Sequence, residues 1–454
     1  MAVGDTPAPA RHNGPMPEEL QRTYRGKAWR EIGEVDDPQG PERAILIASL
    51  ACDADEEADR IDEVRELLHT AGAEVVEEVI QHRDRPDPKL YLGSGRLGDL
   101  KEMVEQLKPD LVAAEGSLTA GQQRHLEDRL KVRVVDRTAI ILDIFAQHAR
   151  SAEGKLQVEL AQLEYSYARQ EGLWQHLERL GGGVGTRGPG ETQLESDRRM
   201  VRNRMATLRR RLADVARSRD TQRERRVGSA IPRVALAGYT NAGKSSLMNA
   251  LADAGVQVND ALFETLDPTT RRVVADGHDL LLSDTVGFIR HLPHQLVNAF
   301  SSTLEEVREA DLILHVADAS EPESRREAQA AAVVKVLDEI GAGEIPRLPV
   351  MNKVDRLDGD ARVALRGRHP EALCVSALTG EGLDDLRAAL ARAARERLVR
   401  LDVTIPFTLS GLVASVYADG REVEREDTES GTHVRALMPP AAAGRIRAAI
   451  AGAG

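Results

Sequence analysis

The hydrophobic positions of this 454-residue chain change period several times, and each change predicts a different kind of element. The apolar run AILIASLAC, which begins at residue 44, predicts a buried strand, and an amphipathic helix is expected over about 56–71. The strand-like runs AEVVEEVI, DLVAAE and VRVVD then alternate with helices over about 95–107 and 119–130. This alternation predicts a parallel sheet with flanking helices, so residues 42–150 are expected to form a small α/β domain.

Between residues 151 and 229 the apolar positions follow alternating steps of three and four. These positions are Leu156, Leu160, Leu163, Tyr167, Gln170, Trp174 and Leu177, followed by Leu194, Val201, Met205, Leu208, Leu212 and Val215. Such spacing keeps one narrow seam on one face of a helix. We therefore expect an antiparallel helical hairpin, a coiled-coil arm with a glycine-rich tip at 181–190. Thr192 and Glu195 have the spacing of a capping box that would start the return helix.

Short Val, Leu and Ile runs return from Arg233 onward, in RVALAG, DLLLSD, ADLILHVAD, IPRLPVMN and ALCVSA. Each is followed by helix-compatible sequence, which is typical of parallel strands covered on both faces. These runs predict an α/β domain over 230–399, and residues 400–454 are expected to form a small α+β domain. Residues 1–41 contain several prolines and no sustained periodicity, so we expect a disordered N-terminal extension.

Composition narrows the class of protein. The two cysteines, Cys52 and Cys374, lie far apart, which argues against disulfides or a zinc site and fits a cytoplasmic protein. No apolar run is long enough to span a bilayer, and residues 1–10 do not resemble a secretory signal. We expect a monomer.

The charge is unevenly distributed along the chain. A net charge of −13 argues against a uniformly basic protein. Residues 198–226, however, hold twelve arginines against Asp214, Asp220 and Glu224, a local balance of 12 − 3 = +9. This block is a candidate polyanion-binding surface, and the alternative is a solvated helix face balanced by acidic neighbours elsewhere.

Three glycine-rich segments compete for the role of a phosphate-binding loop. Residues 183–188 spell GxGxxG, but they follow a heptad helix where a strand is required, so this match is a decoy. YLGSGRLGDL, at 91–100, follows a short strand, and we interpret it as a structural turn, with a second nucleotide site (ATP) as the alternative. GYTNAGKS, at 238–245, fits G-x-x-x-x-G-K-[ST] between a buried strand and a helix.

In that setting the loop amides and the helix N-terminus point at phosphate oxygens. Lys244 is then placed to reach the β- and γ-phosphates, and the Ser245 hydroxyl to ligate Mg²⁺. Downstream, Asp284 ends an apolar strand and begins Asp-Thr-Val-Gly, which places a carboxylate near the magnesium and the Gly287 amide near a γ-phosphate. The four-residue motif is a second sign of a nucleoside triphosphatase.

The base is selected by two further strand ends. Asp355 of Asn-Lys-Val-Asp, at 352–355, is suited to accept both the N1–H and the exocyclic amine of guanine, a donor pair that adenine lacks. Ser376 and Ala377 supply a tight turn whose Ala377 amide would donate to the guanine O6. Four ordered motifs on four strand ends therefore predict a GTP-binding domain.

Two positions bear on the rate of hydrolysis. Ras-like enzymes place after the DxxG glycine a glutamine that orients the attacking water, but this chain has Phe288 there. Hydrolysis is therefore expected to be slow alone and to be completed by a partner or a cation. Asn241 in the loop is the residue type seen in several potassium-stimulated GTPases, so K⁺ is a candidate helper; alternatively, Asn241 only braces the loop backbone.

With these motifs in place, the chain resembles the HflX family of translation-associated GTPases over nearly its full length. The resemblance rests on GYTNAGKSSLMNAL, FETLDPTTR (263–271), DTVGFIR, NKVD and the segment GGGVGTRGPGETQLESDRR. It implies a two-part N-terminal region, a GTPase domain and a small C-terminal domain. It also implies binding to the large (50S) ribosomal subunit and dissociation of stalled or idle ribosomes. Within FETLD it implies that Thr265, in preference to Thr269 or Thr270, is the Mg²⁺-ligating switch threonine.

The expected site is therefore extensive. Its catalytic residues are Lys244, Thr265 and Gly287, and its metal ligands are Ser245 and Thr265. The residues expected to contact the nucleotide are Gly238, Tyr239, Thr240, Asn241, Ala242, Gly243, Lys244, Ser245, Ser246, Phe263, Glu264, Thr265, Leu266, Asp267, Asp284, Thr285, Val286, Gly287, Asn352, Lys353, Val354, Asp355, Ser376, Ala377 and Leu378.

The arm is the expected contact with RNA. Arg187 at the tip and Arg198, Arg199 and Arg202 on the return helix are the candidate residues. Arginine suits this role because its guanidinium binds phosphate in a bidentate manner and stacks on bases. Two other functions stay open: a large-subunit assembly factor, and a non-ribosomal GTP-dependent adaptor that uses the hairpin to dock proteins.

Overall fold

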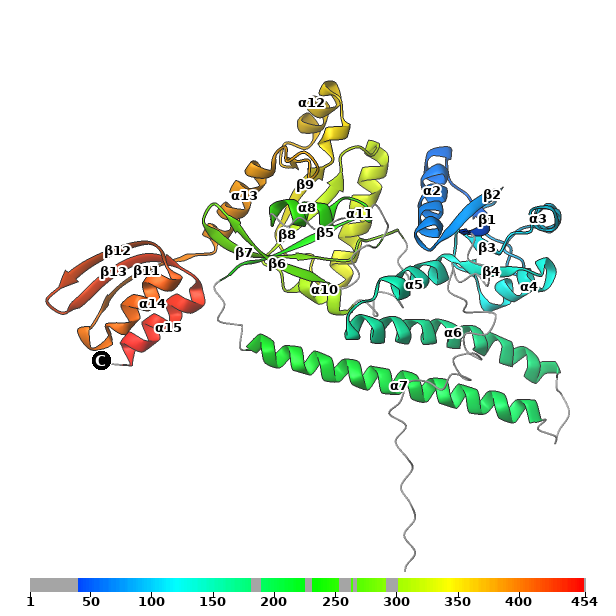
Figure 1. The fold of residues 1–454 in the computed structure, drawn as a ribbon, viewed down its shortest axis with the longest axis horizontal. Coiled ribbons are helices and arrows are strands. Elements are labelled where there is room, and N and C mark those ends of the chain that lie inside the picture. Colours follow the sequence, from blue (N-terminus) through cyan, green and yellow to red (C-terminus); the bar gives the residue numbers. More distant parts are fainter. Residues whose placement is uncertain are drawn as a thin grey trace, which may run out of the picture. The chain divides into compact units, whose positions relative to one another are not determined.

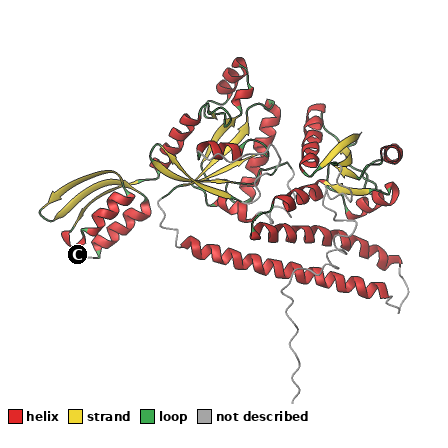
Figure 2. Ribbon diagram, viewed as in Figure 1, coloured by secondary structure: helices red, strands yellow, loops and turns green. Residues whose placement is uncertain are grey.

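The structure is a computed structural model that describes residues 40–180, 189–224, 231–252, 263, 268–290 and 301–452 (Figures 1 and 2). It divides into two compact units, Met1–Asp143 and Ile144–Gly454. The N-terminal extension expected over residues 1–41 lies almost wholly outside the described residues. No described helix combines the length and apolar character that crossing a bilayer requires.

The first unit is built on a four-stranded sheet in the order β2-β1-β3-β4. Each neighbouring pair is parallel, as the alternating pattern predicted. Its elements in chain order are β1 (Glu42–Leu50), α2 (Ala54–Thr70), β2 (Ala73–His82), α3 (Ser94–Leu107), β3 (Leu111–Ala114), α4 (Ala120–Leu130) and β4 (Arg133–Asp136). Helix α5 (Arg137–His148) follows and crosses the boundary between the two units.

The core of this unit forms because β1 is buried along almost its whole length. Ile45 and Ile47, two residues apart on one face of β1, pack in one cluster with Leu100 of α3 and Leu126 of α4. Helix α4 begins with a capping box in which Thr119 and Gln122 each satisfy the other's backbone amide. A continuous apolar strand covered by amphipathic helices therefore gives the α/β domain that the pattern predicted.

The second unit begins with the helical arm. Helix α6 (Ala152–Leu180) and helix α7 (Pro189–Glu224) form the expected hairpin (Figure 1). Two ion pairs join them: Arg204 to Glu159, with 2.7 Å between Nε and Oε1, and Arg209 to Glu164, with 2.7 Å between Nη2 and Oε1. Opposite charges on the two helices therefore face each other, in addition to their apolar residues.

Of the predicted seam on α7, Val201, Met205 and Leu208 are buried, whereas Leu212 and Val215 are half-buried. On α6 the prediction is only partly right, because Leu156 and Leu160 are half-buried whereas Val158, Ala161 and Tyr165 are buried. Burial on α6 is therefore wider than one heptad seam. Helix α7 also begins at Pro189 rather than at the Thr192 capping box, since proline is favoured in the first helical turn.

The GTP-binding motifs lie on a six-stranded sheet in the order β10-β9-β8-β5-β7-β6. The strands are β5 (Arg233–Gly238), β6 (Thr269–Ala275), β7 (His278–Asp284), β8 (Leu312–Asp318), β9 (Arg347–Asn352) and β10 (Leu373–Cys374). The helices between and after them are α8 (Lys244–Leu251), α10 (Ser301–Arg308), α11 (Glu323–Glu339), α12 (Gly359–Arg368) and α13 (Leu383–Glu396), with the 3₁₀ turn η1 at Val354–Arg356. Leu247 of α8 and Leu386 of α13 pack on the sheet in one cluster with Leu236 of β5.

One strand of this sheet departs from the all-parallel expectation. β6 runs antiparallel to β7 at the edge, and Asp276 and Gly277 form the turn between them. Both turn residues have positive φ angles, 46° and 79°, the backbone conformation of a tight two-residue hairpin. The chain thus folds back on itself here before it reaches the Asp-Thr-Val-Gly motif.

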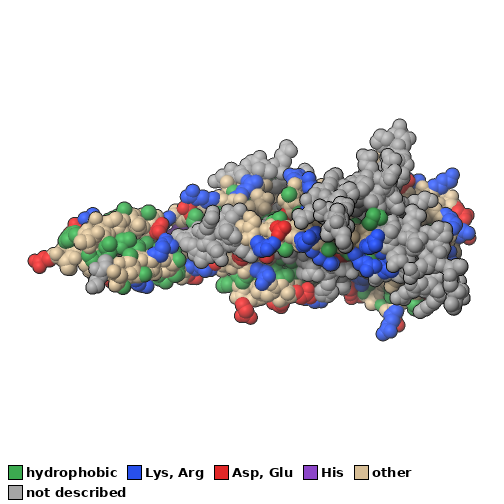
Figure 3. All heavy atoms as spheres, turned by 90° about the horizontal axis from the view of Figure 1, so that it is seen from below, with side chains coloured by type: hydrophobic (Ala, Val, Ile, Leu, Met, Phe, Trp, Pro, Cys, Tyr) green, Lys and Arg blue, Asp and Glu red, His purple; other side chains and the backbone are tan. Residues whose placement is uncertain are grey.

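The C-terminal residues form a three-stranded antiparallel sheet in the order β11-β13-β12, with helices packed on it. The elements are β11 (Val399–Ile405), the 3₁₀ turn η2 (Phe407–Leu409), α14 (Gly411–Asp419), β12 (Arg421–Thr428), β13 (Gly431–Met438) and α15 (Pro440–Ala451). Val416 of α14 and Ile446 of α15 join Leu401 and Val434 in the core. Phe407 and Tyr417 stay more than half exposed, and hydrophobic side chains are prominent on this part of the chain in Figure 3.

Candidate nucleotide-binding and catalytic site

The phosphate-binding loop spans residues 239–243, between the end of β5 and the start of α8. Gly243 takes a φ of +84° at the helix N-cap, and Asn241 takes +58°, so the backbone curls back toward the helix. Gly238 is required by close packing, since a Cβ there would lie 2.2 Å from the carbonyl oxygen of Val316. The sequence motif therefore folds into the strand–loop–helix unit that cradles phosphates.

Lys244 is the first residue of α8, directly after this loop, and is 6% exposed. Its Nζ donates to the carbonyl oxygens of Gly238, at 3.1 Å, and Tyr239, at 2.8 Å. Burial lowers the pKa of the ammonium to about 8, nearby Asp284 opposes the shift, and Lys353 adds to it. A buried cation that is held by backbone oxygens is suited to receive the charge of a phosphate.

Ser245 and Asp284 form the part of the site that suits a magnesium ion. The Ser245 hydroxyl, in the first turn of α8, donates to Oδ2 of Asp284 at 2.6 Å. Asp284 ends β7 and is 1% exposed. A hydroxyl beside a buried carboxylate is the oxygen donor set expected for Mg²⁺ at a triphosphate, so these residues fit the ion.

The Asp-Thr-Val-Gly motif closes against the phosphate-binding loop. A Cβ on Gly287 would lie 2.8 Å from Cα of Thr240 and 3.1 Å from Nζ of Lys244. The amide of Thr240 donates to the carbonyl of Phe288 at 2.8 Å, and the amide of Phe288 donates to the carbonyl of Gly238 at 3.1 Å. The absence of a side chain on Gly287 therefore allows the two segments to touch.

The other side chains of the Asp-Thr-Val-Gly-Phe segment, those of Thr285, Val286 and Phe288, are buried in the interior. Phe288 is 2% exposed, so its ring belongs to the interior and does not take the place of a water-orienting glutamine. The Thr285 hydroxyl donates to the carbonyl of Leu236 at 2.6 Å, and Val286 is buried. Thr285 and Val286 thus shape the segment through packing and one backbone contact.

Tyr239 has a role that sequence reasoning missed. Its hydroxyl accepts a hydrogen bond from the backbone amide of Arg290 at 2.8 Å. The phosphate-binding loop is thereby tied to the chain just beyond Phe288. Local patterns give no sign of this contact because the two residues are 51 positions apart.

The residues predicted to recognise guanine lie together at the ends of β9 and β10. Asn352 donates from Nδ2 to the carbonyl of Ala242 at 3.0 Å, which links this motif to the phosphate-binding loop. Ser376 donates from Oγ to Oδ1 of Asp355 at 2.6 Å and so orients that carboxylate. The Ala377 amide, expected to donate to guanine, donates to Oδ1 of Asn352 at 3.0 Å.

Leu378 follows this turn and is 85% exposed, as a residue that covers the face of a base would be. Val354, by contrast, is buried and packs with Leu365 and Met351. Ser246 lies in the first turn of α8 and is half-buried. Of these residues of the predicted set, Leu378 is thus an exposed candidate contact, whereas Val354 supports the fold.

The first switch lies mostly outside the described residues, which include Phe263 but not Glu264, Thr265, Leu266 or Asp267. Phe263 is buried, and its ring packs edge-on against Phe145, with 4.7 Å between centroids. Thr270 lies in β6, where its hydroxyl contacts that of Ser283 at 2.8 Å, and Thr269 pairs with Asp284 across the strands. Both threonines therefore lie in the β6–β7 pairing, and the predicted metal ligand Thr265 lies outside the described residues.

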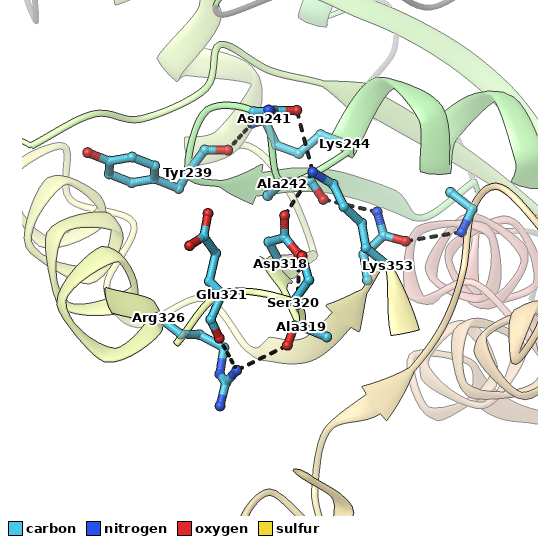
Figure 4. A network of polar contacts seen from close by, with 12 residues as sticks. Tyr239, Asn241, Ala242, Lys244, Asp318, Ala319, Ser320, Glu321, Arg326 and Lys353 are labelled. Carbon is cyan, nitrogen blue, oxygen red and sulfur yellow. Dashed lines mark hydrogen bonds and ion pairs between the residues drawn. The ribbon is translucent and has the colours of Figure 1, made fainter. Parts of the chain in front are cut away.

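Asp318 is a second residue that the sequence motifs did not reveal (Figure 4). It ends β8 and forms an ion pair with Lys353, with 2.8 Å between Nζ and Oδ2. The same Nζ lies 3.5 Å from Oδ1 of Asn241 in the phosphate-binding loop. The only signal available for it was an aspartate at the end of the apolar run ADLILHVAD.

The basic arm is less strongly charged than its sequence implied. Arg204 and Arg209 pair with acidic residues of α6, so part of the +9 balance is neutralised inside the hairpin. Arg199 and Arg202 are exposed, and the Arg198 and Arg202 guanidinium carbons lie 5.5 and 5.9 Å from the Tyr167 ring centroid. Arg187 lies outside the described residues.

The 91–100 loop has the internal contacts of a structural turn. Tyr91 is buried with a φ of +65°, and its hydroxyl accepts from the Gly116 amide at 3.3 Å. The Gly93 amide donates to Oε1 of Gln81 at 2.7 Å. Gly95 and Gly98 lie within α3, where a Cβ would meet no atom within 4 Å. These contacts favour the structural interpretation over a second nucleotide site.

Comparison with known proteins matches four successive parts of the chain to family models. Residues 58–146 match the GTP-binding GTPase N-terminal model, and residues 148–226 match the GTP-binding GTPase middle region. Residues 233–353 match the model described as 50S ribosome-binding GTPase, and residues 363–440 match the HflX C-terminal domain.

Curated relatives cover most of the chain. A protein from Lacrimispora saccharolytica named GTPase HflX is 44% identical over 411 residues, which is 90% of this chain and 95% of that protein. The GTPase HflX of Escherichia coli is 42% identical over 403 residues, which is 88% of this chain and 94% of that protein. Among solved structures, a complex titled SsGBP and GDP aligns with 26% identity and a TM-score of 0.43, over 78% of this chain and 99% of that one.

Proposed function

This chain belongs to the HflX family of GTPases, and we propose that in its GTP-bound form it binds the large (50S) ribosomal subunit and dissociates stalled or idle 70S ribosomes. Its enzymatic activity is the hydrolysis of GTP. On this proposal hydrolysis to GDP and phosphate drives release from the subunit, so the nucleotide times the interaction. We further propose a cytoplasmic monomer.

The observation that carries the ribosomal part is the helical arm, which precedes in the chain a GTPase domain whose family model is described as ribosome-binding. Arg199, Arg202 and Arg210 are exposed on α7 and, at intervals of three and eight residues, recur on one side of the helix. Exposed guanidinium groups along a rigid rod are suited to successive phosphates of structured RNA. Arg187 and Arg198 extend this proposed contact.

The proposed hydrolysis uses groups that the fold brings together. Lys244 would neutralise the β- and γ-phosphates, and the Gly287 amide would donate to the γ-phosphate as its segment closes on Thr240. Ser245 and Thr265 would hold a magnesium ion with Asp284 nearby, and the ion would offset charge on the β- and γ-oxygens. The proposed base contacts are Asp355, oriented by Ser376, together with Leu378.

The environment of Phe288 supports slow hydrolysis by the protein alone. A buried ring cannot orient water, so a partner must complete the site, and we propose that the 50S subunit does so. K⁺ is a second proposed helper, which would be held by Oδ1 of Asn241. That oxygen lies 3.5 Å from Nζ of Lys353, so the cation would have to compete with an ammonium group.

The 50S proposal is tested by GTP turnover with and without purified 50S subunits, in potassium and in sodium buffers. We expect turnover to rise at least tenfold with 50S, and a potassium requirement would support the Asn241 role. No stimulation and no co-sedimentation with 50S would contradict the proposal.

In that case the adaptor function would be favoured, and nuclease treatment of a pull-down would separate protein contacts from RNA-dependent ones. An assembly factor would instead be indicated by immature large subunits accumulating on deletion of the gene.

A further inference from the structure

A polar network joins the loop after β8 to both nucleotide motifs (Figure 4). Its centre is Asp318, which lies in register with Asn352 on the neighbouring strand β9. The amide of Ala319 also donates to the carbonyl of Asn352 at 2.8 Å. Asp318 is therefore fixed beside the guanine-recognition motif by the sheet itself, although it belongs to none of the nucleotide motifs.

Both oxygens of the Asp318 carboxylate are engaged. Oδ1 accepts from the Ser320 amide at 2.9 Å and from the Ser320 hydroxyl at 2.6 Å. Oδ2 pairs with Nζ of Lys353 at 2.8 Å, and the two side chains are only 10% and 14% exposed. A charge-assisted contact with so little exposure is screened far less by salt than a surface ion pair. The carboxylate therefore has one fixed orientation, directed at Lys353.

Lys353 in turn lies against the phosphate-binding loop. Its backbone has a φ of +65°, which turns the side chain back from β9. Its Nζ lies 3.5 Å from Oδ1 of Asn241, and its Cε lies 3.8 Å from the position that a Cβ on Gly243 would occupy. The Lys353 side chain thus bridges the guanine-recognition motif and the phosphate-binding loop.

The charge of Lys353 needs a counter-ion at this position. The Cε of Lys353 lies 3.8 Å from the position that a Cβ on Gly243 would occupy, and the next residue after Gly243 is a buried cation, Lys244. Two like charges in a shielded site repel each other, and this repulsion would push Lys353 outward unless an anion opposed it. Asp318 supplies that anion on the side of Lys353 away from the loop.

Arg326 stabilises the turn that presents Asp318. It lies on α11 and is 6% exposed. Its Nη1 donates to the carbonyl of Ala319 at 3.3 Å and to that of Glu321 at 3.0 Å. The loop after β8, which presents Asp318, is thereby held by a buried guanidinium from α11 (Figure 4).

We infer that Asp318 is a positioning residue for the nucleotide, which holds Lys353 across the phosphate-binding loop and so slows nucleotide release. The inference rests on the proposed assignment of residues 352–355 to guanine recognition. Asp318 lies outside every nucleotide motif. Its loss would therefore change the rate of nucleotide release only through Lys353. If the Asp318–Lys353 ion pair only stabilised the fold, the effect of losing Asp318 on nucleotide release would not depend on Lys353.

The test is a double-mutant cycle on the release of a fluorescent GDP analogue from the full-length protein, chased with excess GDP in a stopped-flow instrument. Asp318→Asn keeps the shape of the side chain and removes its charge, and we expect release about tenfold faster, as for a charged hydrogen bond of this kind. In a Lys353→Met background, Asp318→Asn should change the release rate less than twofold. Asp318→Glu restores the charge and should recover most of the slow release.

Glu309→Gln is the matched control, because it breaks the Arg233–Glu309 ion pair at the opposite end of β5, where Nη1 and Oε2 are 2.6 Å apart. It should leave release unchanged. An unchanged rate in Asp318→Asn, or equal acceleration with and without Lys353, would overturn the inference. If Asp318→Asn does not fold, Ser320→Ala loosens the same carboxylate while both charges remain, and unchanged release in that variant would equally overturn it.

The proposed guanine site has its own readout in the same assay. Asp355→Asn should shift preference from guanine to xanthine nucleotides, because the carboxylate that accepts the two guanine donors is lost. If Asp355→Asn does not shift the preference, the assignment of the guanine site is wrong. If it does shift the preference but Asp318→Asn leaves the release rate unchanged, only the role of Asp318 is wrong.

Discussion

The hydroxyl of Tyr239 accepts a hydrogen bond from the backbone amide of Arg290, with 2.8 Å between the two atoms. Tyr239 belongs to the phosphate-binding loop, and Arg290 follows the Asp-Thr-Val-Gly segment by three residues. Together with the paired amides and carbonyls of Gly238, Thr240 and Phe288, this bond holds the Asp-Thr-Val-Gly segment, which we propose as the second switch, against the loop. The loop that we propose as the phosphate site therefore also positions this switch.

Tyr239→Phe isolates that bond, since it deletes one oxygen and keeps the ring. The loss of a hydrogen bond of this kind is worth about 1 kcal/mol, so 50S-stimulated GTP hydrolysis should fall roughly fivefold. GDP affinity should change little, because the hydroxyl faces the switch. Tyr417→Phe, at a tyrosine 52% exposed, is the control. Equal rates of stimulated GTP hydrolysis in both variants would show that the Tyr239 hydroxyl does not position the switch.

Gly287 should tolerate no side chain. In Gly287→Ala the new Cβ would lie 2.8 Å from Cα of Thr240, so the segment must move away from the phosphate site. We expect stimulated GTP hydrolysis to fall on the order of a hundredfold, as when an oxyanion donor is lost, while GDP binding persists. Gly367→Ala is the control, because its Cβ would meet no atom within 4 Å. Full turnover in Gly287→Ala would contradict the proposed contact with the γ-phosphate.

The lowered pKa of Lys244 predicts a pH effect whose sign can be worked out. Below about pH 8 the ammonium is charged in both the folded and unfolded chain, so its burial penalty is fully present. As the pH rises from about 8 toward 10.5, the ordinary pKa of a lysine, the folded chain loses this proton first and the penalty is relieved. The contribution of Lys244 to folding therefore becomes more favourable over that window.

The same shift is measurable on binding. Phosphate should raise the pKa of Lys244, so GDP binding near pH 8.5 should take up about half a proton or more. Calorimetry in two buffers of different ionisation enthalpy measures that uptake, and the same titration near pH 6.5 should show none from this group. Equal proton uptake at both values would exclude Lys244 as its source.

The arm predicts a salt-dependent contact. Arg199→Ala combined with Arg202→Ala should weaken 50S binding and lower the salt dependence of the affinity by roughly two in log–log slope, one for each lost phosphate contact. Arg425→Ala combined with Arg435→Ala, on the C-terminal sheet, removes the same charge and is the control. Sedimentation at several salt concentrations gives both slopes, and identical slopes would place the RNA contact elsewhere.

The nucleotide site could be predicted from the sequence because its motifs are local, and each follows a strand with a plain apolar pattern. The contacts of Tyr239 and Asp318 could not, since they join residues 51 and 35 positions apart. β6 was missed although Asp276-Gly277 is a hairpin signal, because Arg271 and Arg272 interrupt the apolar pattern of the strand. The charge of the arm was overestimated because Glu159 and Glu164, which neutralise part of it, lie on the other helix.

The central claim is that the GTP-bound protein separates ribosomal subunits. Purified 70S ribosomes incubated with the protein and a non-hydrolysable GTP analogue, then run on a sucrose gradient, test it most directly. We expect the 70S peak to fall while the 30S and 50S peaks rise, with the protein in the 50S fractions, and far less splitting with GDP in place of the analogue. An undiminished 70S peak with the protein left at the top of the gradient would contradict it.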